Sequence, residues 1–132
     1  ARFADTHARV GILPGWGLSQ KLTRIIGINR AREMSLAGNF IDAHRAEAWG
    51  LVNRVCTPEN LMDETLASAA QVADGDANAV IALKALMNDG AKQNLGDALM
   101  LEGERGNVFA KTVDYSQMGE RLAALRKRAA KK

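Results

Sequence analysis

Residues 9–17 read Arg-Val-Gly-Ile-Leu-Pro-Gly-Trp-Gly, a glycine-rich segment that contains one of the chain's two prolines. Glycine gives the backbone unusual freedom and proline fixes one turn, so the part from Gly11 to Gly17 predicts a loop. Two further blocks follow: Leu-Ala-Gly-Asn-Phe-Ile-Asp-Ala over residues 36–43 and Ala-Trp-Gly-Leu-Val over residues 48–52. Gly38 and Asn39 in the first of these blocks are expected to turn the chain.

The sequence around these blocks predicts short elements before Pro58. The expected strands are Ala1–Asp5, Phe40–Ile41 and Leu51–Cys56. The expected helices are Ser19–Ile26, a second one from Asn29 to Leu36, and Ala43–Trp49. Asn29 and Asp42 are expected to cap the second and third helices, and Gly27 and Gly50 to end the first and third.

After Pro58 the pattern predicts helices alone, because apolar side chains recur at helical spacing, beginning with Met62, Leu66, Ala69 and Ala73. Polar and glycine residues interrupt the pattern at Asp74–Asp76 and again near Gly90. The predicted helices cover residues 62–73, 80–90, 94–111 and 116–130.

The composition is that of a folded domain, since 47% of the 132 residues are apolar and 25% are charged. No apolar run approaches the roughly 20 residues that a membrane helix needs. The first residues also lack the apolar segment of a signal peptide. The single cysteine, Cys56, excludes an internal disulfide and fits a reducing compartment. We therefore expect a cytoplasmic protein.

Positive charge is concentrated at the C-terminus. Residues 119–132 contain six basic side chains and one acidic one, a net charge of +5, whereas the whole chain carries +3. Such a tail is usually solvated, and it can also meet the phosphates of a cofactor, a nucleic acid or a lipid. Tyr115 is the one aromatic residue near the tail, so platforms for base stacking are lacking and nucleic-acid binding is not expected.

Together the three blocks resemble the second half of crotonase-superfamily proteins, the enoyl-CoA hydratase/isomerase group. The resemblance implies an α/β fold: the last part of a ββα spiral over residues 1–57, then a C-terminal helical trimerisation region over residues 58–132, with the chain mostly helical. It implies acyl-coenzyme A thioesters as substrates and a homotrimer or a dimer of trimers as the assembly. It also implies that an N-terminal half of the same fold lies upstream of Ala1 and is required.

Members of this family share a reaction that passes through an enolate, in which the thioester oxygen gains negative charge. Two backbone N–H groups stabilise that oxygen, and the resemblance places them upstream of this chain. Hydratases of the family use two glutamates to hold a water and move its proton. One of these also lies upstream, and the other belongs to a Pro-Glu pair shortly before a Gly-x-x-Pro-Gly loop. Thr6-His7 occupies the place of that pair here.

His7 has two interpretations. As a replacement acid/base it suits proton transfer, because an unperturbed imidazole titrates near about pH 6.5. Asp5 would share a face with His7 on an extended strand and could orient the ring. Alternatively, His7 lines a pocket whose chemistry is lost, altered or supplied by another residue. Imidazole does not reproduce the acceptor pair of a carboxylate, so a faithful two-glutamate mechanism is not expected.

The resemblance also gives candidate substrate-binding residues: Thr6, Gly15, Trp16 and Lys127. Trp16 lies in the loop that borders the acyl chain, so its indole either caps the pocket or anchors the following helix in the core. Lys127 lies nearest to a basic pair that approaches the phosphates of coenzyme A in resembling enzymes, where lysine acts as a point charge. The alternative is a solvated helix end whose cations complement the helix dipole.

The resemblance predicts an enoyl-CoA hydratase, which is a lyase. The protein could equally be a related isomerase, and in either case His7 replaces one catalytic glutamate. A non-catalytic homologue that binds acyl-CoA is the alternative. His7 and His44 lie far apart in the sequence and Cys56 stands alone, so no metal site is expected. No cofactor is expected beyond the acyl-coenzyme A substrate.

Overall fold

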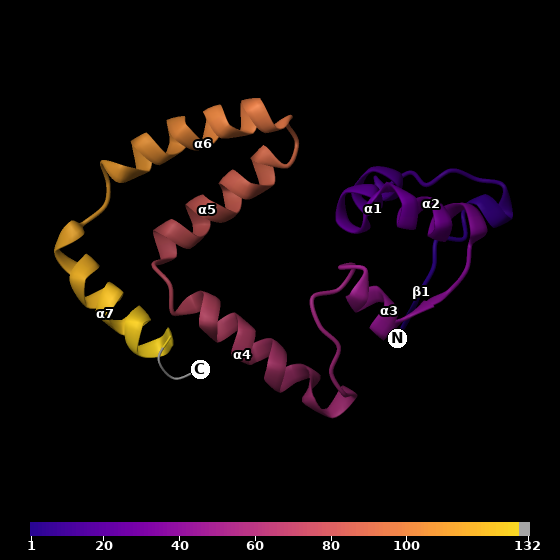
Figure 1. Cartoon of the computed structure of the whole chain (residues 1–132), viewed down its shortest axis with the longest axis horizontal. Coiled ribbons are helices and arrows are strands. Elements are labelled where there is room, and N and C mark those ends of the chain that lie inside the picture. Colours follow the sequence, from indigo (N-terminus) through magenta and orange to yellow (C-terminus); the bar gives the residue numbers. More distant parts are fainter. Residues whose placement is uncertain (130–132) are drawn as a thin grey trace. The chain divides into compact units, whose positions relative to one another are not determined.

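A computed structural model describes residues 1–129, apart from the side chain of Gln117. The chain forms two compact units, Ala1–Ala67 and Ser68–Lys132, and the division falls within helix α4, Leu61–Ala73. Helices dominate both units (Figure 1). After Pro58 the described residues form helices and turns alone, as the sequence predicts.

The first unit combines two short strands with helices. The strands are β1 (Arg2–Phe3) and β2 (Ile41–Asp42), and the helices before α4 are α1 (Leu18–Ile26), α2 (Ile28–Ala37) and α3 (Ala43–Ala48). Two 3₁₀ turns cover Ala8–Val10 and Pro58–Asn60. These elements confirm the predicted helices and two of the three predicted strands, with somewhat different ends.

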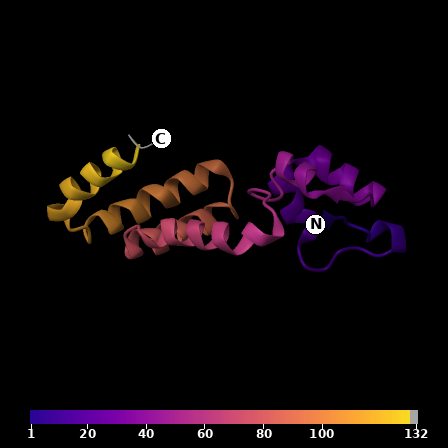
Figure 2. The same ribbon diagram turned by 90° about the horizontal axis from the view of Figure 1, so that it is seen from below.

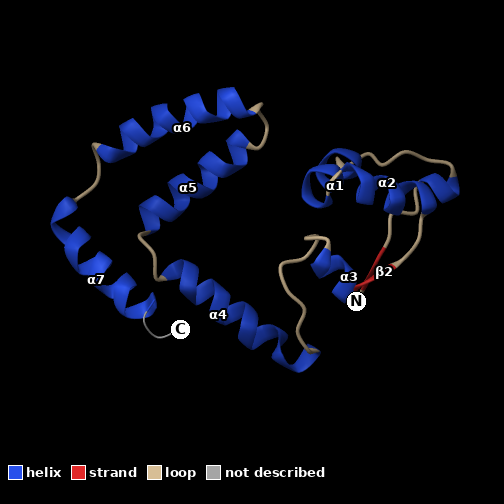
Figure 3. Cartoon of the chain, in the orientation of Figure 1, coloured by secondary structure: helices blue, strands red, loops and turns tan. Residues whose placement is uncertain are grey.

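β1 and β2 pair in the antiparallel sense, with Arg2 opposite Asp42 and Phe3 opposite Ile41 (red in Figure 3). Ile41 is buried and Phe3 packs against the core, so one side of this ladder faces the helices. The pairing of β1 with β2 therefore fixes the end of β1 relative to the core. The next residues, which include Asp5 and His7, start from a place anchored to the core.

The core of the first unit is built by α1, α2, β2 and α3. Because α1 and α2 pack against each other and α3 follows β2 directly, their apolar faces meet in one cluster. Phe3, Leu18, Trp49, Leu51 and Val52 pack around it as partly buried side chains. The buried members of the cluster are Leu22, Ile26, Ala31, Met34, Ile41 and Ala46.

The starts of α2 and α3 differ in how closely they follow the sequence prediction. Asn29 does not cap α2: Gly27 takes that position at a φ of 83°, without a side-chain cap. The reason is that Gly27 both ends α1 and begins α2, which leaves no separate loop for a capping residue. Asp42 does cap α3 as predicted, since its Oδ1 accepts a hydrogen bond from the Arg45 backbone N–H at 2.8 Å.

The predicted strand at Leu51–Cys56 is wrong, and the segment is irregular. A strand needs a neighbouring strand for its backbone N–H and C=O groups. The sheet in the described part of the chain contains β1 and β2 alone. The segment bonds to α3 and its end instead: the Leu51 N–H donates to the Ala46 carbonyl at 2.8 Å, and the Val55 N–H donates to the Glu47 carboxylate at 3.0 Å.

The second unit is helical and contains α5 (Ala77–Gly90), α6 (Leu95–Ala110) and α7 (Met118–Ala129), with a 3₁₀ turn at Tyr115–Gln117. These helices confirm the predicted ones. The expected end of the last helix at Ala130 lies outside the described residues. Figure 1 shows α5 and α6 side by side, in agreement with their extensive packing contacts, and Figure 2 gives the same ribbon seen from below.

Polar side chains fix the turns of the second unit. Asp76 caps α5 by accepting from the Ala79 N–H at 2.9 Å, and Asn94 caps α6 by accepting from the Asp97 N–H at 3.0 Å. The other Asp76 oxygen pairs with Arg121 on α7 at 2.9 Å. Unlike the first unit, this unit has no fully buried residue among the described residues of α5, α6 and α7.

Candidate functional site

Asp5 and His7 form a hydrogen-bonded pair just after β1. The Asp5 Oδ1 lies 2.7 Å from the His7 Nδ1 and also accepts a hydrogen bond from the His7 backbone N–H at 3.2 Å. The Asp5 side chain is 4% exposed and the His7 side chain is 27% exposed. The pair therefore places a partly accessible imidazole over a buried carboxylate.

The contact between Asp5 and His7 is the predicted one, but the predicted route to it is wrong. The strand ends at Phe3, and His7 adopts helical backbone angles, with φ −56° and ψ −47°, at the start of the 3₁₀ turn Ala8–Val10. Asp5 thus reaches His7 through a tight turn, in which an aspartate side chain accepts from the backbone two residues later. A shared strand face plays no part in the contact.

Two contacts from α2 and its end anchor this turn. Ser35 interacts with the Asp5 carboxylate and lowers its pKa, and the Arg9 Nε donates to the Ala37 carbonyl at 2.7 Å. Burial raises the pKa of Asp5, but the interactions with Ser35 and His7 outweigh burial and hold this pKa below its usual value. Asp5 is therefore an anion at neutral pH, and His7 sits beside that negative charge.

The loop at residues 11–17 continues directly from this turn, as the sequence predicts. The Ile12 N–H donates to the His7 carbonyl at 3.1 Å, which ties the loop to the site. Gly11 and Gly17 have φ of 75° and 83°, in the left-handed region that favours glycine. Gly17 then begins α1. The glycines thus allow the two sharp changes of direction that bring the chain from His7 to α1.

Trp16 projects from this loop and is 90% exposed, while its neighbour Leu13 is 91% exposed. The interpretation of Trp16 as a core anchor beneath the following helix is therefore wrong. The exposed indole remains compatible with the interpretation as a pocket cap. Thr6 and Gly15 are also exposed. Thr6, Gly15 and Trp16 are consequently exposed residues of the segment that begins at the Asp5–His7 pair, in which His7 itself is partly buried.

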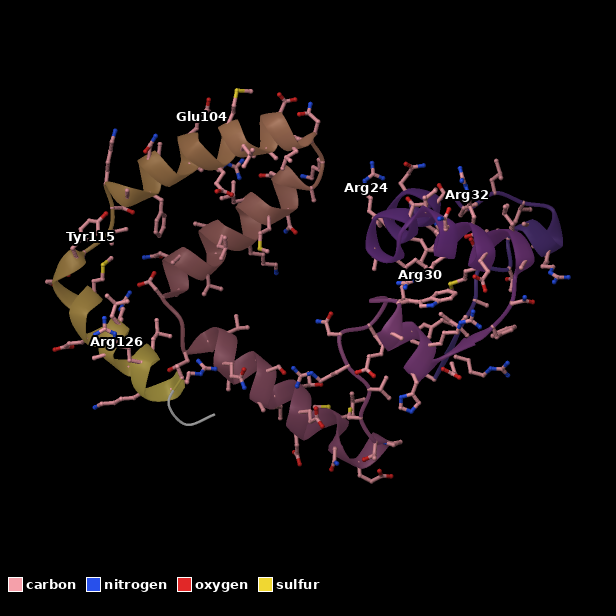
Figure 4. The ribbon with its side chains drawn as sticks, in the orientation of Figure 1. Arg24, Arg30, Arg32, Glu104, Tyr115 and Arg126 are labelled. Atoms are coloured by element: carbon pink, nitrogen blue, oxygen red, sulfur yellow. The ribbon has the colours of Figure 1, made fainter. Side chains whose placement is uncertain are left out.

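Lys127 lies in the other unit, in the last turn of α7, between Arg126 and Arg128. Its side chain is exposed, and the cations stand where the C-terminal end of the helix dipole favours them. Arg126, labelled in Figure 4, belongs to the same turn. The structure therefore keeps both interpretations of Lys127, phosphate contact and solvated helix end.

The remaining candidate groups do not gather into a second site. His44 is exposed on α3, and Cys56 is partly buried and unpaired. Within residues 1–129, no three His, Cys, Asp or Glu side chains come together in a way that would hold a metal ion. None of the described helices combines the length and the hydropathy that crossing a membrane requires.

Two features of the structure have no counterpart in the sequence analysis. Arg30 and Arg45 lie over the ring of Trp49, at 5.8 Å and 4.7 Å from its centroid, and Figure 4 shows Arg30 reaching from α2 toward α3. A groove of about 710 Å³ runs between α5 and α6, lined largely by apolar side chains such as Leu83 and Val108. Helical periodicity indicated the apolar face of α5, but not the groove between α5 and α6.

Comparisons with known proteins agree with this architecture. The family model described as Enoyl-CoA hydratase/isomerase matches residues 1–129. The chain belongs to this family, and thus to the crotonase superfamily. It is 39% identical over 132 residues to a probable peroxisomal enoyl-CoA hydratase of Arabidopsis thaliana, a match that covers all of this chain and 50% of that protein.

A second relative is a probable enoyl-CoA hydratase of Rhizobium meliloti, 32% identical over 127 residues, or 96% of this chain and 49% of that protein. Among solved structures, an enoyl-CoA hydratase subunit of Geobacillus kaustophilus has a TM-score of 0.79 at 31% identity, covering 96% of this chain and 49% of that one. The enoyl-CoA hydratase of Bacillus anthracis reaches a TM-score of 0.82 at 27% identity, covering 97% and 48%.

The chain thus spans about half the length of the curated relatives that it matches. The structural matches confirm the predicted fold class: the later part of a crotonase-type α/β fold, mostly helical in this chain.

Proposed function

We propose that this chain supplies His7 as the proton-transfer group of an enoyl-CoA hydratase- or isomerase-type site that acts on acyl-coenzyme A thioesters. The observation that carries this proposal is the Asp5–His7 pair at 2.7 Å, at the position where the family resemblance expects a glutamate. Support comes from the family match over residues 1–129 and from the names of the relatives. The exposure of the His7 side chain also leaves it accessible to a ligand.

The proposed hydration moves one proton through the His7 ring. The ring accepts a proton from water as the water oxygen bonds to the β-carbon of the enoyl thioester. The electron pair of the double bond shifts toward the thioester oxygen, which becomes an enolate oxygen. The imidazolium then returns a proton to the α-carbon, and the ring is neutral again. We propose that the backbone N–H groups that stabilise the enolate come from the N-terminal half of the fold.

The substrate-binding part of the proposal involves Thr6, Gly15 and Trp16 around the acyl chain and Lys127 at the phosphates of coenzyme A. The exposure of Thr6, Gly15 and Trp16 supports the first part. The three successive cations at the end of α7 support the second. Calorimetry at low and high salt measures the affinity of Lys127→Ala for acetyl-CoA. The matched control is Lys84→Ala, because Lys84 is an exposed lysine on α5.

We also propose a homotrimer or a dimer of trimers, because the described apolar side chains of α5, α6 and α7 have no core of their own to enter. We propose a cytoplasmic location for the full-length protein. The printed name of the Arabidopsis relative places that protein in the peroxisome. Imaging of the full-length protein with a fluorescent tag distinguishes the two compartments.

The decisive experiment follows the loss of the conjugated double bond of crotonyl-CoA with the full-length protein. Replacing His7 by Ala should lower kcat by about 10²-fold or more, the usual contribution of a general acid/base. His44→Ala is the matched control, because His44 is an exposed histidine on α3 outside the site. An unchanged rate in the His7 variant removes His7 from the mechanism. Binding of acyl-CoA without turnover by the wild type favours the alternative, a non-catalytic binder.

A further inference from the structure

His7 has two ring nitrogens, and the structure distinguishes them. Nδ1 lies 2.7 Å from the Asp5 Oδ1, and an ionised carboxylate only accepts hydrogen bonds. The hydrogen between these atoms must therefore sit on Nδ1. In the neutral ring this leaves Nε2 with a free lone pair, since a neutral imidazole carries one N–H. The geometry thus defines both the tautomer and the atom that can accept a proton.

Asp5 is well placed to hold the ring in this state. Its carboxylate is buried and receives the His7 backbone N–H as well as Nδ1 on one oxygen. Ser35 on α2, an element that packs into the core, also interacts with this carboxylate and lowers its pKa. Because Ser35 interacts with Asp5, this arrangement differs from a nucleophilic triad, in which serine bonds to histidine. Asp5 instead bridges the scaffold and the imidazole.

Building on the proposed function, we infer that Asp5 is a positioning residue that fixes His7 with Nδ1 protonated, so that Nε2 performs the proton transfer. This arrangement separates two tasks that a single glutamate would combine. The negative charge stays buried on Asp5, and the proton is exchanged at the accessible ring. When Nε2 accepts a proton, the imidazolium that forms lies against the Asp5 carboxylate, which stabilises it.

The first test needs neither turnover nor substitution of Asp5. Long-range ¹H–¹⁵N correlation spectra of the full-length protein, with ¹⁵N-labelled histidine, report the tautomer of each ring at neutral to slightly alkaline pH. The His7 signal is identified by its loss in His7→Gln. We expect the neutral His7 ring to be the Nδ1–H tautomer, although free imidazole side chains favour Nε2–H. An Nε2–H tautomer in the wild type overturns the inference directly.

The second test compares Asp5→Asn with Asp63→Asn, which makes the same change at an exposed carboxylate on α4. We expect Asp5→Asn to abolish the preference for the Nδ1–H tautomer. We also expect it to lower kcat for crotonyl-CoA by about 10²-fold while KM changes far less, because the ring is misdirected and the substrate contacts remain. Asp63→Asn should change neither. Circular dichroism verifies that each variant is folded.

The outcomes separate this inference from the proposed function. If the wild type does not turn over crotonyl-CoA, the proposed function fails, and the tautomer spectra still decide what Asp5 does to His7. If turnover is present and Asp5→Asn keeps both the tautomer and kcat, Asp5 has no positioning role. If Asp5→Asn does not fold, Ser35→Ala serves as the second variant. It keeps the Asp5 carboxylate, so we expect His7 to keep the Nδ1–H tautomer.

Discussion

Both the backbone conformation at position 38 and the space around it require glycine. It ends α2 at a φ of 62°, and a Cβ placed there would lie 2.5 Å from the Arg9 Cγ. We expect Gly38→Ala to lower the free energy of unfolding by at least about 1–2 kcal/mol, the cost of a left-handed L-residue. Urea denaturation followed by circular dichroism measures this change.

The matched control is Gly103→Ala in the interior of α6, where an added Cβ meets nothing within 4 Å. Alanine favours a helix interior over glycine by about 0.5–1 kcal/mol, so this variant should be more stable than the wild type. Equal effects at Gly38 and Gly103 would contradict the structural explanation.

The lowered pKa of Asp5 predicts how stability depends on pH. Its pKa in the folded protein lies below the usual value for an aspartate, so ionisation of Asp5 stabilises the fold at every pH above that usual value. This contribution is lost as the pH falls through the folded pKa. The difference in Tm between wild type and Asp5→Asn should therefore be larger at pH 7 than in strongly acidic buffer. A Tm difference that stays constant with pH would show that the Asp5 charge does not contribute.

Part of the candidate site could be predicted from the sequence. The spacing of residues 5 and 7 indicated that Asp5 could orient His7, and the structure confirms this contact. The contribution of Ser35 could not be predicted, because it depends on how α2 packs against the end of β1. The exposure of Trp16 likewise depends on the tertiary path of the loop, which local sequence does not define.

At the scale of elements, α3 depends on its N-terminal cap. The helix has six residues, and Asp42 satisfies one of its first free N–H groups. Asp42→Ala should cost about 1 kcal/mol of unfolding free energy, whereas Asp42→Asn should keep most of it, because asparagine caps helices equally well. Denaturation midpoints of the two variants provide the comparison, and an equal loss in both would exclude the capping explanation.

Helices were more predictable than strands in this chain for a physical reason. A helix satisfies its backbone groups locally, so the apolar spacing of residues 62–73 sufficed to identify α4. Residues 51–56 have the composition of a strand, but strand formation depends on a partner, and the described chain places α3 beside them instead. The prediction that Asn29 caps α2 was wrong for a related reason. The direct junction of α1 and α2 at Gly27 is a tertiary feature, which local sequence does not define.

At the scale of the whole molecule, the two units differ in how they bury apolar surface. The first has a core, whereas on α5 and α6 Leu83 is 56% exposed and Val108 is 65% exposed. If the proposed oligomer covers this groove, Val108→Asp should shift the sedimentation coefficient toward a smaller species and leave helicity unchanged. Lys84→Asp, at an exposed charged position on α5, is the control. An unchanged sedimentation coefficient for Val108→Asp would exclude the groove from the interface.

The contrast between the two tryptophans gives the chain a pair of natural optical reporters. Trp16 is almost fully in water, whereas Trp49 packs against the core with two guanidinium groups over its ring. A neutral quencher of fluorescence meets the first indole freely and the second only in part. The red part of the emission therefore comes from Trp16 and reports changes at the glycine-rich loop. The blue part comes from Trp49 and reports unfolding of the core. One spectrum thus records ligand arrival and unfolding separately, without any attached dye.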